Sequence, residues 1–280
     1  MRKEDFDLLS TILKERSGLV LSEDKVYLLE SRLTPIARKK GMETLDDLIN
    51  EIRLRRKEEL LNEITEAMTT NESFFFRDNT PFDLLKDDVL PALMQSRAAS
   101  KRIRIWCSAA STGQEPYSIA IILKEMAAEL DGWKIDIVGT DLSNKVLDKA
   151  KAGIYSQFEV QRGLPIKLLM KYFTQAGEMW QISDEIRRMV TYRPFNLLND
   201  YSSLGTFDVI FCRNVLIYFQ QDTKAAVLNR LRGQMPDDGT LFLGAAETVL
   251  GLSDKFKPVP GKRGMYMTSD NIMHKTLKVG

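Results

Sequence analysis

Residues 107–118, Cys-Ser-Ala-Ala-Ser-Thr-Gly-Gln-Glu-Pro-Tyr-Ser, constrain the fold of this chain more than any other stretch. They follow an apolar, strand-like run at 103–106 and precede a run with helical spacing from Ile119 to Met126. A strand, a turn of small residues and a new helix bring free backbone N–H groups and the positive end of a helix to one edge of a sheet. This order predicts an α/β fold in which the loop binds part of a ligand.

The residues of this loop also restrict the kind of ligand. The loop lacks the Gly-Lys-Ser/Thr ending of a phosphate-binding loop and the GxGxxG spacing of dinucleotide-binding folds. Glu115 lies at the start of the helix, where its carboxylate repels phosphate and suits a ligand with positive charge. We therefore expect S-adenosylmethionine, a nucleoside that carries an ammonium and a sulfonium group.

The apolar pattern divides the chain into an all-α part and an α/β part. Helical patterns predict an N-terminal helical domain over 1–76 and a linker helix over 77–100. Over 101–268, strand patterns alternate with helical ones, which predicts a mostly parallel sheet covered on both faces. Residues 172–193 instead predict a small antiparallel insert, and 269–280 a flexible tail. The strand patterns lie at 103–107, 135–140, 207–212, 240–244 and 264–268, and the helical ones at 115–130, 143–151 and 222–235.

The composition is that of an ordinary globular protein. The 280 residues are 44% hydrophobic and 28% charged, and the formal net charge is +1. This charge does not support general attraction to nucleic acid or membranes, and no apolar run approaches the roughly 18 residues of a membrane helix. The first residues, Met1 to Asp5, are charged, so we expect a cytoplasmic protein.

Cysteine and histidine usage limits the chemistry. Cys107 and Cys212 lie in apolar, strand-like runs, where reduced core thiols are expected rather than a disulfide or a metal site. The one histidine, His274, falls in the polar tail. Schemes of the Ser-His-Asp and Cys-His types are therefore excluded, and we expect no metal.

Polar residues follow several of the predicted strands. Asp141 ends the second strand, where an acid either hydrogen-bonds ribose hydroxyls or caps the next helix. Asn196 and Leu197 follow the run at 190–195 and can place an amide and an apolar side chain against a base. The stretch 213–219 directly follows the strand at 207–212, which suits either a pocket rim or a loop whose aromatics belong to the core.

Five separated motifs occur in order along the chain. They are Thr70-Asn71-Glu72-Ser73-Phe74-Phe75-Phe76-Arg77, Ala110-Ser111-Thr112-Gly113-Gln114-Glu115-Pro116-Tyr117-Ser118, Gly139-Thr140-Asp141, Phe195-Asn196-Leu197 and Phe211-Cys212-Arg213-Asn214-Val215-Leu216-Ile217-Tyr218-Phe219. Together they resemble the CheR family, the chemotaxis receptor methyltransferases, which use S-adenosylmethionine to form glutamate methyl esters. The resemblance extends over roughly residues 1–268.

This resemblance implies a class I (Rossmann-like) S-adenosylmethionine-dependent methyltransferase domain with a small inserted antiparallel β-subdomain, preceded by an all-α N-terminal domain. It implies S-adenosylhomocysteine as the product and, as the partner, the cytoplasmic domain of methyl-accepting chemotaxis receptors. It implies cofactor contacts at Asn71, Ser73, Arg77, Glu115, Asp141, Asn196, Leu197, Arg213 and Asn214.

One branch of the resembled family docks a pentapeptide from the receptor's C-terminus on the β-subdomain. That branch uses a longer loop with a Gly-x-x-Pro turn. Here the loop is only Gln175-Ala176-Gly177-Glu178. We therefore expect the pentapeptide-independent type.

The expected reaction needs alignment rather than a base. A glutamate with a pKa near ~4.3 is already ionised at neutral pH. The charges of anion and cation cancel along the reaction path, so aromatic walls suit the site. Phe74, Phe75, Phe76 and Tyr218 can supply such walls, although at least one phenylalanine is expected to be only an interdomain core plug. Strong pairing of Arg77 with the attacking oxygen would stabilise the ground state, so we expect Arg77 to orient the cofactor tail or the spectator oxygen. Tyr218 is expected to contact the methyl region.

Two basic clusters remain. The first cluster lies at the end of an amphipathic helix and comprises Arg32, Arg38, Lys39 and Lys40. The resemblance implies that this helix faces an acidic receptor, so we expect substrate recognition there. The second, at 53–57, is offset by neighbouring glutamates and suits a solvated face. The alternatives are a nucleic-acid methyltransferase, which the net charge of +1 disfavours, and a cofactor-binding scaffold without turnover.

Overall fold

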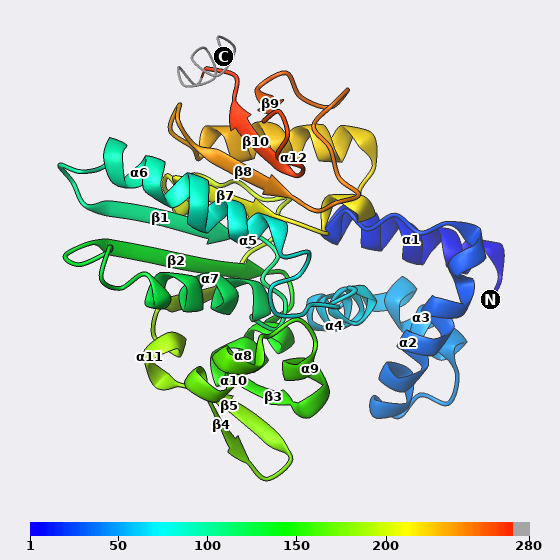
Figure 1. The fold of residues 1–280 in the computed structure, drawn as a ribbon. Coiled ribbons are helices and arrows are strands. Elements are labelled where there is room, and N and C mark those ends of the chain that lie inside the picture. The colour runs from blue at the N-terminus through cyan, green and yellow to red at the C-terminus, as the bar shows by residue number, and fades with distance from the viewer. Residues whose placement is uncertain (271–280) are drawn as a thin grey trace. The chain divides into compact units, whose positions relative to one another are not determined.

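The computed structural model describes residues 1–270 (Figure 1). The described residues form two compact units, one of Met1–Thr70 with Tyr218–Thr223 and one of Asn71–Ile217 with residues 224–270. The first unit thus ends before the predicted boundary at 76, and the predicted linker at 77–100 lies within the second unit. All but the first two residues of the predicted tail, His274 included, lie outside the described residues.

The first unit is all-α, as predicted. Its main helices are α1 (Lys3–Ser17), α2 (Val26–Lys39), α3 (Leu45–Arg55) and α4 (Glu58–Met68). Gly18, with φ 76°, ends α1 in the left-handed conformation that glycine adopts without strain. Thr44 and Asp47 form a capping box at the start of α3. Apolar side chains at helical spacing, such as Leu9, Leu33 and Ile64, are fully buried in one core.

The second unit contains a seven-stranded sheet in the order β6-β2-β1-β7-β8-β10-β9. The first five strands in this order are parallel, whereas β10 runs antiparallel to both β8 and β9. The strand order reverses between β1 and β7, so the crevice at the carboxyl ends of these strands is where a ligand is expected. The strands are β1 (Arg102–Cys107), β2 (Lys134–Asp141), β6 (Val190–Pro194), β7 (Val209–Cys212), β8 (Thr240–Leu243), β9 (Phe256–Pro258) and β10 (Met265–Thr268).

Alternating side chains of the buried strands form a core on each face of this sheet. Phe211 of β7 stacks on Phe82 and faces the same core as Ile105 of β1. The neighbouring Trp106 points to the opposite face, where its ring contacts Phe207. The helices that flank the sheet in Figure 1 are α5 (Thr80–Leu84), α6 (Leu90–Ser96), α7 (Gln114–Glu125), α8 (Asn144–Ala152) and α12 (Gln221–Gly233), with a π-helical turn at Leu85–Val89 joining α5 to α6.

The β-subdomain differs from the predicted insert at 172–193. It is a three-stranded antiparallel sheet in which β5 (Met179–Ile182) lies between β4 (Phe173–Ala176) and β3 (Ile154–Ser156). The predicted β4–β5 hairpin is correct, but β3 was missed because three residues carry no readable alternation. The end of the predicted insert was wrong, because β6 pairs in parallel with β2 as an edge strand of the main sheet. Short helices surround the small sheet, namely α9 (Gln157–Gln161), α10 (Ile166–Tyr172) and α11 (Asp184–Arg187).

Cys107 and Cys212 are both buried free thiols, as predicted. Over residues 1–270, each helix is too short or too polar to cross a membrane.

Candidate active site

Ser111 brings together three of the five motifs. Its backbone N–H donates to Asp141 Oδ2 at 2.9 Å, and its hydroxyl donates to the carbonyl of Asn71 at 2.8 Å. The segment before α5, the β1–α7 loop and the end of β2 therefore meet at the carboxyl edge of the sheet. The sequence identified Ser111 only as one of the small residues of the loop. Its bridging contacts could not be predicted, because both partners are distant in the sequence.

Asp141 is not the N-cap residue of α8. The residue before α8 is Ser143, and its backbone N–H donates to Asp141 Oδ1 at 3.1 Å. Each oxygen of the Asp141 carboxylate thus accepts a backbone N–H, one from each side of the strand end. These donors hold the carboxylate, which is only 9% exposed, in a fixed orientation at the site.

Glu115 lies in the first turn of α7, as predicted. Gly113 precedes this helix with φ 97°, a conformation that side chains other than glycine rarely adopt. The Glu115 carboxylate is buried and accepts from Arg213 Nη1 at 2.8 Å. Burial raises the pKa of Glu115, and the neighbouring Arg213 opposes that rise. The acid expected to meet a cationic ligand therefore also has a cationic partner within the chain.

Arg213 connects the end of β7 both to Glu115 of α7 and to the segment before α5. Its Nη2 donates to the Arg77 carbonyl at 2.8 Å and to Asp78 Oδ2 at 2.7 Å, and its side chain is 1% exposed. The Nε of Arg213 is buried and has no hydrogen-bond acceptor anywhere in residues 1–270. A buried unpaired donor is costly, so this atom fits a site in which a ligand completes the hydrogen bonds.

Glu247 is a residue that the sequence reasoning missed. It lies in the loop after β8, and its carboxylate accepts backbone N–H groups from the loop after β7, including that of Asn214 at 2.8 Å. The sequence did contain a signal for Glu247, because an acid shortly after a parallel strand is the pattern that identified Asp141. Glu247 was passed over because its loop carries none of the five motifs.

The three phenylalanines divide between core and surface. Phe75 is fully buried and makes edge contacts with Tyr155 and Phe173, so it is a core residue of the second unit rather than the expected interdomain plug. Phe74 is half-buried, and the Arg162 guanidinium lies 4.3 Å from its ring centroid.

Arg77 lies in the same segment and contacts it twice. Its Nη1 donates to the Glu72 carbonyl at 3.1 Å, and its guanidinium lies 5.3 Å from the centroid of the Phe74 ring. Ser73, between these residues, is half-buried. Arg77 is therefore held at one side of the segment, with part of its surface accessible.

Left-handed backbone conformations gather at this site. Phe76, Asp78, Ser111 and Asn214 have φ values of 50°, 70°, 49° and 58°. Non-glycine residues rarely adopt such values, and the cost is largest for a bulky side chain such as that of Phe76. The Phe76 N–H donates to Ser118 Oγ at 2.9 Å, which helps to hold this conformation. Strain of this kind concentrates where function fixes the backbone.

Asn196 and Leu197, both predicted as cofactor contacts, follow the edge strand β6. Asn196 Oδ1 accepts the backbone N–H of Leu198 at 3.0 Å, and Leu197 is 6% exposed. Leu197 is thus part of the interior beside the loop that follows β6. The space beside Gly113 is also filled, because a Cβ there would lie 2.8 Å from the Tyr192 hydroxyl. The absence of a side chain at Gly113 therefore permits the close packing of Tyr192.

Tyr218 and Arg32 belong to the first unit. The Tyr218 carbonyl accepts the backbone N–H of Val20 at 3.0 Å. Arg32 Nη1 donates to the carbonyls of Met68 and Thr69 at 2.8 and 3.0 Å. The guanidinium thereby satisfies backbone acceptors at the end of α4, a structural function that the sequence did not reveal.

The other basic residues of the predicted recognition helix are exposed. Arg38 and Lys39 end α2, and Lys39 pairs with Glu63 at 3.1 Å. Lys40, which follows them, pairs with the same carboxylate at 2.8 Å. Such exposed pairs contribute little stability, so these side chains can exchange partners.

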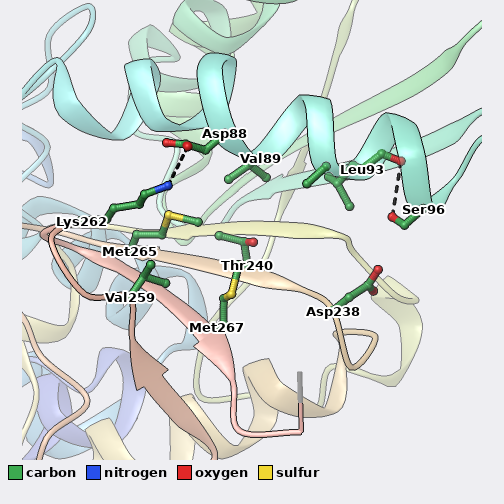
Figure 2. A pocket seen from close by; sticks show the side chains of 11 residues that line it. Asp88, Val89, Leu93, Ser96, Asp238, Thr240, Val259, Lys262, Met265 and Met267 are labelled. Carbon is green, nitrogen blue, oxygen red and sulfur yellow. Dashed lines mark hydrogen bonds and ion pairs between the residues drawn. The ribbon is translucent and has the colours of Figure 1, made fainter. Parts of the chain in front are cut away.

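A cavity of about 170 Å³ lies elsewhere in the second unit (Figure 2). It opens between α6 and the strands β8 and β10, with Leu93, Met265 and Met267 among its lining residues. An ion pair of 2.6 Å between Lys262 and Asp88 lies at one side. The lining includes none of the residues that the sequence predicted for the site.

Two family models match the chain. The model of the CheR methyltransferase all-alpha domain matches residues 4–69. The model of the CheR methyltransferase SAM binding domain, where SAM is S-adenosylmethionine, matches residues 71–265. The boundary between the two models coincides with the end of the first compact unit at Thr70.

Curated relatives resemble the chain over nearly all of its length. Chemotaxis protein methyltransferase 1 of Vibrio cholerae is 42% identical, over 88% of this chain and 90% of its own. Chemotaxis protein methyltransferase 1 of Pseudomonas aeruginosa is 41% identical, over 93% and 96%. The chemotaxis protein methyltransferase of Escherichia coli is 33% identical, over 90% and 86%. The chain therefore belongs to the CheR family of S-adenosylmethionine-dependent methyltransferases.

Proposed function

We propose that this protein is a cytoplasmic glutamate O-methyltransferase that acts on the cytoplasmic helices of chemoreceptors. It forms glutamate methyl esters for sensory adaptation. The names of the relatives support the chemotaxis assignment. The observation that carries the proposal is the meeting of the motifs around Ser111, Asp141, Glu115 and Arg213 at the carboxyl edge of the sheet.

The proposed cofactor contacts follow from the chemistry of each side chain. The buried Glu115 carboxylate binds the ammonium group, and the Asp141 carboxylate accepts hydrogen bonds from ribose hydroxyls. Asn196 and Leu197 face the base, while Arg77 binds either the carboxylate of the methionine part or the spectator oxygen of the substrate. The remaining proposed contacts are Asn71, Ser73, Arg213 and Asn214. S-adenosylmethionine, when bound, supplies a methyl group on a cationic sulfur.

The residues of the chain align and shield the reacting groups. A glutamate side chain is ionised at neutral pH, so the site needs no general base. Charge diminishes in the transition state, and Phe74 excludes water that would favour the separated ions. Arg77 orients the cofactor tail or the spectator oxygen of the substrate, because a tight pair with the attacking oxygen would slow the reaction. Alignment of this kind accounts for roughly 7–11 kcal/mol of the barrier.

The β4–β5 hairpin supports the pentapeptide-independent type. Ala176 pairs with Met179, so Gly177 and Glu178 alone form the turn. Gly177 has φ 63°, as a tight hairpin turn requires. This two-residue turn is shorter than the loop that holds a pentapeptide in the other branch.

Receptor recognition is proposed for Arg38 and Lys39 on α2, without Arg32. Reversing the charge of both residues (Arg38→Glu with Lys39→Glu) is expected to weaken binding of a receptor cytoplasmic fragment about tenfold at low salt. The difference should shrink at high salt because the exposed charges are screened. The melting temperature should not change, whereas Arg32→Glu should lower it by removing the contacts at the end of α4. Equal binding at low salt by the double variant would remove α2 from the interface.

The reaction itself is tested by transfer of a tritiated methyl group. Purified protein is incubated with labelled S-adenosylmethionine and a receptor cytoplasmic fragment, and the labelled product is treated with base. The proposal predicts label on the receptor that base releases as methanol, as expected of an ester. Label that resists base, or label on nucleic acid but not on the receptor, would contradict the proposal.

A further inference from the structure

A single carboxylate gathers four backbone N–H groups where β7 and β8 end. Glu247 Oε2 accepts from Asn214 at 2.8 Å and from Gly244 at 2.7 Å. Glu247 Oε1 accepts from Val215 at 2.9 Å and from Ile217 at 3.3 Å. Three of these donors belong to residues 213–217, which we call the exit loop. The fourth follows β8 directly.

The exit loop needs such an acceptor because of its backbone conformation. Asn214 is left-handed, with φ 58°, so the chain turns sharply as it leaves β7. Successive N–H groups around a left-handed residue point to one side and form a concave site that favours an anion. Here the anion is the Glu247 side chain, and charge-assisted hydrogen bonds of this kind are stronger than neutral ones.

Gly244 shows how closely the parts fit. A Cβ on this residue would lie 2.8 Å from Glu247 Oε2, 2.8 Å from Asn214 Nδ2 and 3.0 Å from the Asn214 nitrogen. Contacts below 3.0 Å force a shift, so any larger residue at 244 would displace either the carboxylate or the exit loop. Gly244 and Glu247 thus offer two independent ways to disturb the same arrangement.

We propose that Glu247 is a positioning residue of the cofactor site. Its carboxylate fixes the backbone of the exit loop and thereby the positions from which the side chains of Arg213 and Asn214 extend. Arg213 in turn holds Glu115 and the turn at Asp78. This inference rests on the proposed cofactor contacts of Arg213 and Asn214. Glu247 itself need not touch the cofactor.

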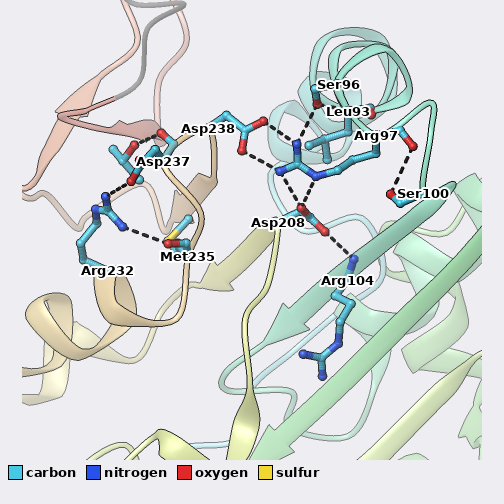
Figure 3. Close-up of polar contacts among 11 residues, drawn as sticks. Leu93, Ser96, Arg97, Ser100, Arg104, Asp208, Arg232, Met235, Asp237 and Asp238 are labelled. Carbon is cyan, nitrogen blue, oxygen red and sulfur yellow. Dashed lines mark hydrogen bonds and ion pairs between the residues drawn. The ribbon is translucent and has the colours of Figure 1, made fainter.

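A purely structural carboxylate at the opposite end of the sheet provides a matched control. Asp208, before β7, accepts the backbone N–H of Arg104 at 2.8 Å and the Nε of Arg97 at 3.0 Å (Figure 3). Like Glu247, it binds a backbone donor and lies beside a strand end. Asp208→Asn and Glu247→Gln remove the same charge with little change of shape.

The test compares these variants with wild type in S-adenosylhomocysteine binding by calorimetry, in the KM for S-adenosylmethionine and kcat, and in melting temperature. Glu247→Gln and Gly244→Ala are expected to raise the Kd about tenfold and to lower kcat/KM about 100-fold, because a shift of about 1 Å in positioned groups has effects of this size. Asp208→Asn is expected to lower the melting temperature with an unchanged Kd. Glu247→Asp should recover part of the lost affinity, because it keeps the charge.

Three results decide the matter. Folded Glu247→Gln or Gly244→Ala protein that binds S-adenosylhomocysteine as wild type does would overturn the inference. Equal loss of affinity in Asp208→Asn would also overturn it, because the loss would then reflect general destabilisation. If Glu247→Gln does not fold, Gly244→Ala carries the test. Wild-type protein that fails to bind S-adenosylhomocysteine would instead contradict the proposed cofactor contacts, so the two failures are distinguishable.

Discussion

The two ends of the parallel sheet both hold an arginine between two carboxylates. At the amino end, Arg97 lies 3.0 Å from Asp208 and donates through both Nη atoms to Asp238, at 2.8 and 2.6 Å (Figure 3). At the carboxyl end, Arg213 lies between Glu115 and Asp78 at 2.8 and 2.7 Å. The composition of the two clusters is similar, but their environments differ.

The difference lies in burial and in completeness. The side chains of Arg97 and its two partners are 14–32% exposed, and pairing with Arg97 holds the pKa of Asp238 below its usual range. Arg213 is 1% exposed, has a buried Nε without an acceptor in residues 1–270, and lies beside strained backbone, while burial raises the pKa of Glu115. In a cluster that only stabilises the fold, the charged groups satisfy one another's hydrogen bonds. A cluster that binds a ligand retains unsatisfied groups, at a local cost in stability.

The largest expected effect comes from removing each arginine. Arg213→Met should lower the free energy of unfolding by about 3–5 kcal/mol, because it leaves a buried Glu115 charge uncompensated. Arg97→Met should cost about 2 kcal/mol, since it removes hydrogen bonds to charged groups nearer the surface. Urea unfolding measures both values, and calorimetry at a temperature where both are folded should show lost S-adenosylhomocysteine binding in Arg213→Met alone. Equal losses of binding would erase the distinction between the two ends.

Arg77→Lys should affect turnover without affecting the fold. Lysine keeps the charge but lacks the planar fork, so we expect kcat to fall about tenfold to 100-fold through misalignment. The side chain is partly exposed and makes one hydrogen bond, to the Glu72 carbonyl, so the melting temperature should stay near that of wild type. Methyl-transfer kinetics and thermal unfolding check these two outcomes. Unchanged kinetics would remove Arg77 from the mechanism.

The two ends should also respond oppositely to pH. The lowered pKa of Asp238 means that its contribution to stability is present above the ordinary Asp pKa and is lost as pH falls through the lowered value. The raised pKa of Glu115 means that its ionisation costs stability, so this cost appears as pH rises through the window between the ordinary Glu pKa and the raised value.

Ligand binding adds a readout for the carboxyl end alone. An ammonium ligand needs ionised Glu115, so S-adenosylhomocysteine affinity should fall as pH falls through the raised pKa. Glu115→Gln should bind more weakly with a flatter pH profile, whereas Asp238→Asn should keep the wild-type profile. A wild-type profile in Glu115→Gln would assign the titration to another group.

The sequence predicted the positions of residues at strand ends well, because local order determines them. Asp141 and Arg213 follow parallel strands, and the carboxyl ends of such strands share one edge, so their proximity was foreseeable. The pairing of Glu115 with Arg213 joins residues 98 positions apart, and no local pattern reveals it. The same limit applies to Arg32, which was predicted as a recognition residue. Its acceptors, the carbonyls of Met68 and Thr69, lie at the end of another helix, so the local sequence does not reveal its structural contacts.

The β-subdomain shows the same limit for secondary structure. The β4–β5 hairpin was predicted from its turn residues, but Val190 to Pro194 was assigned to the wrong sheet. An edge strand with one exposed side alternates as an antiparallel strand does, and only its pairing with β2 distinguishes the two.

Calorimetric titration of S-adenosylhomocysteine into wild type, Glu115→Gln and Asp208→Asn tests most directly whether the carboxyl end is the site. Wild type and Asp208→Asn should bind with the same Kd. Glu115→Gln should bind about 30-fold or more weakly, because losing one partner of a buried charged hydrogen bond costs about 2 kcal/mol or more. Folded Glu115→Gln protein that binds as tightly as wild type would contradict the assignment of this end of the sheet.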